Sequence, residues 1–254
     1  MQLSSEDYHK AFRRWVSPGW FFALILLLIL SIVRFILVLQ ANMLYGNYQF
    51  ISYLFMAMVI LPFLLLNRRG RKKIGIKRIE RWKGIGWGMI FGIMSCALIF
   101  VVMYGLFGKT ENHAFTYIAR TFQGLPEMMD AQTRLIYFFI FAGISMFFSP
   151  LGEELFYRGF IHESFAVTLG HSKASLLDSL AFSLVHLAHF GIVYLDGQWQ
   201  LLFWPSVIWM VGLFGSCLLF NRARVLSGSI LGAIVAHACF NLTMTYFIFY
   251  HILI

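Results

Sequence analysis

Seven long apolar blocks dominate this sequence of 254 residues. They run over residues 19–39, 48–66, 84–107, 135–158, 178–195, 203–220 and 228–252. About 20 apolar residues are needed for a helix to cross the hydrocarbon core of a bilayer, and membrane-spanning strands would alternate in polarity, which these blocks do not. Hydrophobic residues make up 60% of the chain and charged residues 12%, whereas soluble domains carry about 25% charged residues. We therefore predict an all-α polytopic membrane protein with about seven to eight transmembrane helices.

The basic residues predict how the chain is oriented. The net charge is +9, and nine of the 20 Lys and Arg residues lie in residues 68–83, opposed there only by Glu80. Alternate segments between the blocks, counted from the N-terminus, carry 16 Lys and Arg, and the other set carries 3. The positive-inside rule then places the N-terminus in the cytoplasm. We expect the 68–83 loop to contact anionic lipid and no nucleic acid. The first block, preceded by basic residues and without a cleavage pattern, is expected to be an uncleaved signal anchor.

Some polar residues outside the blocks are expected to be solvated. The segment 109–134 is predicted to be either a surface-lying amphipathic helix or a plain loop. The residues expected to contact solvent near interfaces and loops are His113, His162, Glu163, His171 and Asp196. The three cysteines lie inside apolar blocks without CxxC spacing, which is typical of small core residues.

Ionisable groups inside the later blocks mark a candidate site. They are Glu153, Glu154 and Arg158 in the fourth block, His186 and His189 in the fifth, and His237 with Asn241 in the seventh. Such groups are costly in hydrocarbon and by default indicate function. Glu154 and Arg158, four residues apart, share a helix face and are expected to pair. Glu153 is rotated by about 100° from Glu154. At a rise of about 1.5 Å per residue, Glu153, His186 and His237 fall at similar depths, so three helices could bring them to one cavity.

This set of groups suggests hydrolysis by water. Glu153 with His186 could take a proton from water as it attacks an amide carbonyl, and His237 with Asn241 could donate hydrogen bonds to the oxyanion. The sequence contains no GxSxG, HExxH or P-loop motif that would offer another catalytic set. Arg34, deep in the first block, is expected to snorkel or to pair with a partner rather than to contact substrate.

The same residues carry a family resemblance. EELFYR, FSLVH and HACFN resemble the EExxxR, FxxxH and HxxxN signatures of the CPBP family, the CAAX-prenyl-protease and bacteriocin-processing membrane proteins also called Abi proteins. The resemblance covers roughly residues 135–245. It implies Glu153 and His186 as the base, His237 and Asn241 as oxyanion donors, and Glu154 and Arg158 as support. We accordingly predict a single integral membrane domain over 1–254, with variable N-terminal spans (1–134) and a catalytic core (135–252) formed by the last four helices.

The resemblance implies an intramembrane endopeptidase that acts on a membrane-attached peptide or protein near the cytoplasmic face, here of a bacterial membrane. We expect no cofactor. Glu153, His186 and His237 would also make a His₂Glu zinc set, so a metalloprotease mechanism stays open. A non-catalytic immunity or scaffold protein that binds a partner through the same cavity is the alternative of a different class, and a proton-coupled transporter is a third.

Overall fold

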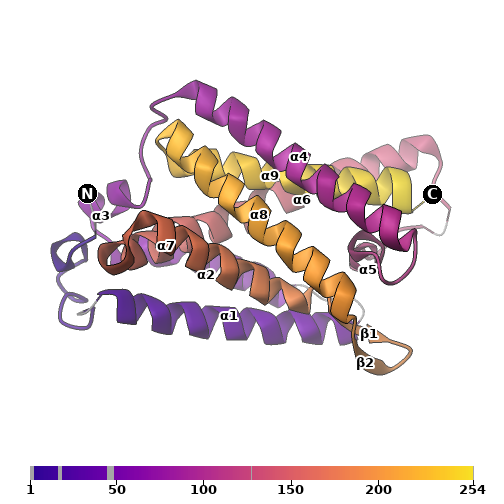
Figure 1. The fold of residues 1–254 in the computed structure, drawn as a ribbon, viewed down its shortest axis with the longest axis horizontal. Helices are drawn as coiled ribbons and strands as arrows, with labels where there is room; N and C mark the ends of the chain where they lie inside the picture. The colour runs from indigo at the N-terminus through magenta and orange to yellow at the C-terminus, as the bar shows by residue number, and fades with distance from the viewer. Residues whose placement is uncertain (1–2, 17–18, 45–48, 127, 254) are drawn as a thin grey trace.

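The computed structural model of the protein describes residues 3–16, 19–44, 49–126 and 128–253. It is a bundle of long helices with the N-terminal segment and the last turns of the chain at opposite ends (Figure 1). The helices are α1 (Gly19–Met43), α2 (Gln49–Leu65), α3 (Arg68–Lys73), α4 (Trp82–Phe107), α5 (Ala114–Ala119), α6 (Ala131–Glu153), α7 (His162–Val185), α8 (Phe203–Ser227) and α9 (Ile230–Phe247). Short 3-10 turns cover Ser5–Asp7 and His186–Ala188, and π-helical turns cover Glu154–Ile161 and Ile248–Ile252.

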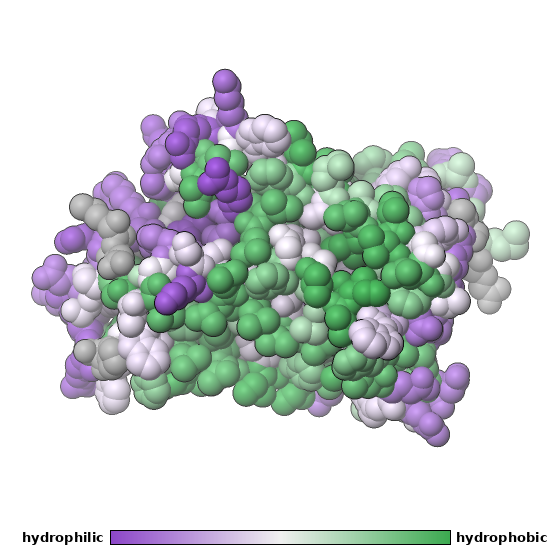
Figure 2. All heavy atoms as spheres, in the orientation of Figure 1, coloured by the Kyte–Doolittle hydropathy of each residue, from purple (hydrophilic) through white to green (hydrophobic). Residues whose placement is uncertain are grey.

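The prediction of a polytopic helical membrane protein is confirmed. Within the described ranges, five helical stretches are long and apolar enough to span a membrane, and α2 is a shorter apolar helix. One of the five, Ala131–Ala188, contains both the fourth and the fifth predicted span. Figure 2 shows the matching surface, an apolar band across the middle of the molecule with hydrophilic residues gathered toward both ends.

The boundary between the fourth and fifth spans was predicted wrongly. The segment 158–177 was expected to be a loop after Arg158, but the helix continues through the π-helical turn and reverses only at Gly170, where φ is 77° and ψ is 161°. Glycine adopts this backbone conformation without the clash that a Cβ would cause. Two of the polar residues that suggested a loop, His162 and Glu163, are instead buried by partners within the protein, whereas His171 is exposed as expected.

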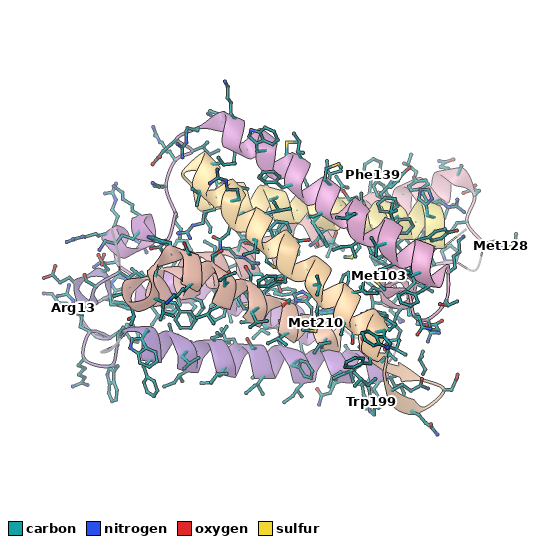
Figure 3. The ribbon with its side chains drawn as sticks, viewed as in Figure 1. Arg13, Met103, Met128, Phe139, Trp199 and Met210 are labelled. Carbon is teal, nitrogen blue, oxygen red and sulfur yellow. The ribbon has the colours of Figure 1, made fainter. Side chains whose placement is uncertain are left out.

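The fifth span also ends earlier than predicted. Residues 192–195, placed in the apolar block 178–195, form strand β1 (Ile192–Leu195), which pairs antiparallel with β2 (Gln198–Leu201). The hairpin turns at Asp196 and Gly197, both of which have positive φ, as a two-residue type I′ turn requires. The apolar side chains therefore belong to a small hairpin at the end of the bundle, where Figure 3 labels Trp199.

Where the structure describes it, the segment 109–134 does not form a helix on the surface, and it is not a loop throughout. Its helix α5 has five buried residues out of six and packs in the same core cluster as α4 and α8. His113, expected to be solvated, is fully buried and caps α5 by accepting a hydrogen bond from the Phe115 amide at 3.1 Å. The aromatic residues of the segment therefore serve packing.

Glycines allow α4 to approach its neighbours closely. Gly84, Gly88 and Gly92 recur every fourth residue, and a Cβ built on any of them would overlap the backbone of α8 or α9. Small residues at this spacing let helices in membranes pack with their backbones in contact. The arrangement fixes α9, and with it the seventh-span motif, against α4.

The segments that the count of Lys and Arg assigned to one side of the membrane lie at the same end of the bundle. Lys73 pairs with Asp7 of the N-terminal segment at 2.6 Å, and the Glu80 amide donates to the Ser227 carbonyl at 3.0 Å. At the opposite end, the Tyr194 amide donates to the Tyr117 hydroxyl at 2.9 Å, which joins the hairpin to α5. The alternation of sides is therefore as expected from the sequence, whereas the assignment of one side to the cytoplasm remains a prediction.

Candidate functional site

A cavity of about 250 Å³ lies inside the bundle, and three of the predicted site residues, His186, His237 and Asn241, line its wall. As expected, α6, α7, α8 and α9 all contribute to it, but α1, α2 and α5 line it as well, which the sequence did not predict. Its polar lining consists of Arg34, Ser52, Ser145, Ser149, His186, His189, His237 and Asn241. The rest is largely apolar, so the cavity suits a hydrophobic segment with a few polar atoms.

Glu153 lies beside this cavity, fully buried at the end of α6. Its Oε1 pairs with Nη2 of Arg34 at 2.6 Å, and its Oε2 accepts a hydrogen bond from the Ser149 hydroxyl at 2.6 Å. The same Oε2 is 3.8 Å from Nε2 of His237. A buried charge persists only when it is paired and hydrogen-bonded, and both conditions are met here by residues from two helices.

His186 lies on the other side of Arg34. Its Nδ1 donates to the Phe182 carbonyl at 2.7 Å, which leaves Nε2 as the acceptor in the neutral ring. That Nε2 is 3.0 Å from Nη2 of Arg34, and His189 is 3.4 Å from the same Nη2. Arg34 thus bridges Glu153 and His186.

His237 is oriented by the second glutamate. Its Nδ1 lies 2.8 Å from Oε1 of Glu154, which leaves Nε2 directed toward Glu153. Glu154 in turn faces Nε of Arg158 at 3.4 Å, as the i, i+4 spacing predicted. The guanidinium of Arg158 lies 4.4 Å from the centre of the Phe182 ring, a cation–π contact. Glu154 and Arg158 therefore position His237 from behind the cavity.

Asn241 follows His237 by one helical turn and also lines the cavity. Its Nδ2 donates to the Ser145 carbonyl at 2.8 Å. Because an amide nitrogen carries two hydrogens, one such bond leaves a second N–H that can point at a ligand. Glu153, His186, His237 and Asn241 are thus brought to one place.

Sequence reasoning missed two members of the site, Arg34 and Ser149. Arg34 was expected to snorkel or to pair with a partner; it pairs within the chain, with a glutamate 119 positions away. The sequence signal that could have identified it is that Arg34 is the one charged residue in α1, which has the highest mean hydropathy of the five long spans. An unpaired charge would be costly there. Ser149 shares a face with Glu153 through the i, i+4 spacing.

The arrangement does not fit a zinc ion held by Glu153, His186 and His237. The Arg34 guanidinium already occupies the space between Glu153 and His186, at 2.6 Å and 3.0 Å from their ligand atoms. A second cation could enter only if Arg34 moved away. Among the described residues, the ligand atoms that do converge on a metal-sized space belong to His162, Glu163 and His171, outside this cavity.

The fold and this site define a polytopic helical membrane protein with a buried Glu–His–His–Asn cluster at an internal cavity. Residues 135–243, a little under half of the chain, match the family model described as type II CAAX prenyl endopeptidase Rce1-like. Over these residues the chain is similar to the CAAX-type intramembrane proteases, and the family resemblance of the three motifs is confirmed. Searches of curated proteins and of solved structures find no match.

Proposed function

We propose that the protein is an intramembrane endopeptidase that hydrolyses a peptide bond of a membrane-attached peptide or protein. The observation that carries the proposal is the convergence of His186, His237 and Asn241 on one mostly apolar cavity, with Glu153 buried beside it and 3.8 Å from His237. The family match supports the same activity class.

In the proposed reaction, water is the nucleophile. Glu153, together with His186, takes a proton from water as the oxygen attacks the amide carbonyl. The oxyanion accepts hydrogen bonds from Asn241 and from Nε2–H of His237, which we propose acts as an imidazolium because its Nδ1–H donates to the Glu154 carboxylate. Collapse of the tetrahedral intermediate breaks the C–N bond, and the proton held by Glu153 passes to the leaving amine. One water is consumed and two peptide products form.

Arg34 has a place in this mechanism as a positioning residue. It contacts both halves of the proposed base, so substrate and water must enter beside it or shift it. Its charge offsets the cost of burying the Glu153 carboxylate. Because this guanidinium takes the place of a metal between the two groups, we propose a mechanism without a cofactor.

The substrate class follows from the cavity and the predicted orientation. Ile51, Phe55, Phe148 and other apolar residues line the same cavity as the polar groups, which suits a hydrophobic or lipid-modified segment. We propose that cleavage takes place near the cytoplasmic face of a bacterial membrane, with the N-terminus cytoplasmic and the 68–83 loop on anionic lipid. Bacteriocin or peptide processing would be one use of this activity.

Replacement of Glu153 by Gln tests the proposal. Mass spectrometry of membrane peptides from cells with the wild-type or the variant protein would identify a peptide that accumulates uncut. In proteoliposomes, we expect cleavage of that peptide to fall by about 10²–10⁴-fold, and Glu80→Gln, on the exposed surface, to cleave normally. Wild-type activity in Glu153→Gln, or a cellular function that survives at normal protein level, would favour the non-catalytic scaffold. Loss of cleavage on chelation, restored by zinc, would overturn the metal-free mechanism if it also occurs in a variant that lacks the exposed His171.

A further inference from the structure

A second cluster of ligand-type side chains lies at the end of the bundle where α7 reverses direction. His162, Glu163 and His171 each place one ligand atom within 4.8 Å of the others. His162 and Glu163 are buried, whereas His171 is exposed at the edge of a cavity of about 520 Å³. We propose that this cluster is a binding site for a divalent transition metal of the zinc type, formed by His162 Nε2, His171 Nδ1 and the Glu163 carboxylate.

The spacing of the two imidazoles fits such an ion. His162 Nε2 and His171 Nδ1 are 3.2 Å apart. Two nitrogens that each lie about 2.0–2.1 Å from a tetrahedral zinc ion are separated by about 3.3 Å. The residues are nine positions apart in the chain, and the reversal at Gly170 brings them together. Small rotations of the two side chains would therefore suffice to accept a metal.

The environment of His162 is the second and independent observation. Its Nδ1 lies 2.7 Å from Oδ2 of Asp178, a fully buried carboxylate. With Nδ1–H donated to that carboxylate, Nε2 carries the lone pair and points toward His171. A carboxylate that fixes the tautomer and the direction of a histidine in this way is the usual support of a metal ligand. The Asn221 side chain donates to the same Asp178 oxygen at 3.2 Å and holds it in place.

The charges around the cluster permit a cation. Arg224 pairs with one oxygen of Glu163 at 2.5 Å, and a carboxylate has a second oxygen to offer a metal. The exposed Arg222 also lines this cavity, where solvent screens its charge. Two lysines line the cavity too, and Lys73 pairs with Asp7 and Lys77 with Glu80, each at 2.6 Å. Their positive charge is thus matched by acids outside the cluster. Three protein ligands at an open cavity leave a fourth position for water.

The site is distinct from the proposed catalytic residues, so it can be tested separately from the proposed function. Tag-free protein in detergent would be stripped with chelator and titrated with zinc chloride by calorimetry. Tetrahedral coordination would be followed by the visible absorption of added Co²⁺. We expect one ion per chain, at least a tenfold loss of affinity in His171→Ala, and unchanged binding in His9→Ala, which removes another exposed histidine.

The controls separate this site from the catalytic cavity. Glu153→Gln should bind zinc as the wild type does, and zinc should raise the apparent Tm of the wild type but not of His171→Ala. Because His171 is exposed, its removal is expected to leave the fold intact. The proposal is wrong if the wild type binds no zinc, in which case the two imidazoles share only a hydrogen bond. It is equally wrong if His171→Ala binds normally or if Glu153→Gln abolishes binding.

Discussion

The ion pair between Arg34 and Glu153 leads to the sharpest prediction. Arg34 is 2% exposed and Glu153 is fully buried, and their atoms approach to 2.6 Å. Arg34→Met keeps much of the side-chain volume and removes the charge, which leaves the glutamate carboxylate buried without its cation. Removal of one partner from a buried pair costs about 3–5 kcal/mol. For a chain of this size, about 2–4 °C of Tm per kcal/mol gives a fall in apparent Tm of roughly 6–20 °C.

A double-mutant cycle isolates the pair from the other contacts of Arg34. Arg34→Met, Glu153→Gln and the double variant would be compared by thermal unfolding in the same detergent, followed by circular dichroism. Because the double variant removes both charges, we expect it to be more stable than the sum of the single losses predicts, by about 0.5–3 kcal/mol. Arg78→Met, at an exposed position, is the matched control and should stay within about 0.5 kcal/mol of the wild type.

Two outcomes would refute this reasoning. If Arg34→Met unfolds at the wild-type temperature, then Glu153 does not depend on Arg34 for its charge. If the two single losses simply add in the double variant, then the two side chains do not interact in the folded protein. Either result would also remove the physical reason for assigning Arg34 a role in positioning the proposed base.

Two further predictions concern other parts of the fold. Gly92→Ala would drive a Cβ into the Ala236 carbonyl of α9, whereas a methyl group added at Gly86, on the same helix, would meet no atom within 4 Å. We therefore expect Gly92→Ala to lower the free energy of unfolding by about 1–3 kcal/mol. Gly86→Ala should raise it by about 0.5–1 kcal/mol, and thermal unfolding would measure both. Burial lowers the pKa of His113 from 6.5 to about 4. Between pH 6.5 and pH 4 the unfolded chain protonates this histidine more readily than the folded protein does. The free energy of unfolding should therefore fall by about 3 kcal/mol as the pH drops from above 6.5 to below 4. His113→Asn keeps a side chain suited to the helix N-cap and should lose this pH dependence; an unchanged dependence would assign it to another group.

The membrane spans and the main site residues could be predicted from the sequence because both signals are local. A block of about 20 apolar residues identifies a span wherever it packs. Glu153, His186 and His237 are conspicuous because ionisable groups are rare in such blocks, and the structure brings them together around Arg34 and the cavity. The pairing of Glu154 with Arg158 followed from helical spacing alone.

Two features that the sequence did not predict, the burial of Glu163 and of His113, depend on partners from other helices. Residues 158–177 suggested a loop because they are polar, but Glu163 is buried by Arg224, 61 positions later. His113 was expected to be solvated, yet its ring lies 5.3 Å from the ring of Phe100 on α4, inside an aromatic cluster. No periodicity in a sequence records such long-range pairs, so burial of a single polar residue could not be foreseen.

The charges at the site explain why the first helix belongs to it. Within residues 135–243, the buried cluster contains three carboxylates, Glu153, Glu154 and Asp178, but the buried Arg158 contacts only two of them. A buried charge without a partner is strongly destabilising, and within residues 135–243 Glu153 contacts the Ser149 hydroxyl and the His237 ring but no arginine or lysine. The missing cation comes from Arg34 on α1. The N-terminal spans are therefore needed to complete the site, and replacing them with an unrelated anchor helix should leave Glu153 uncompensated even though every motif residue is kept.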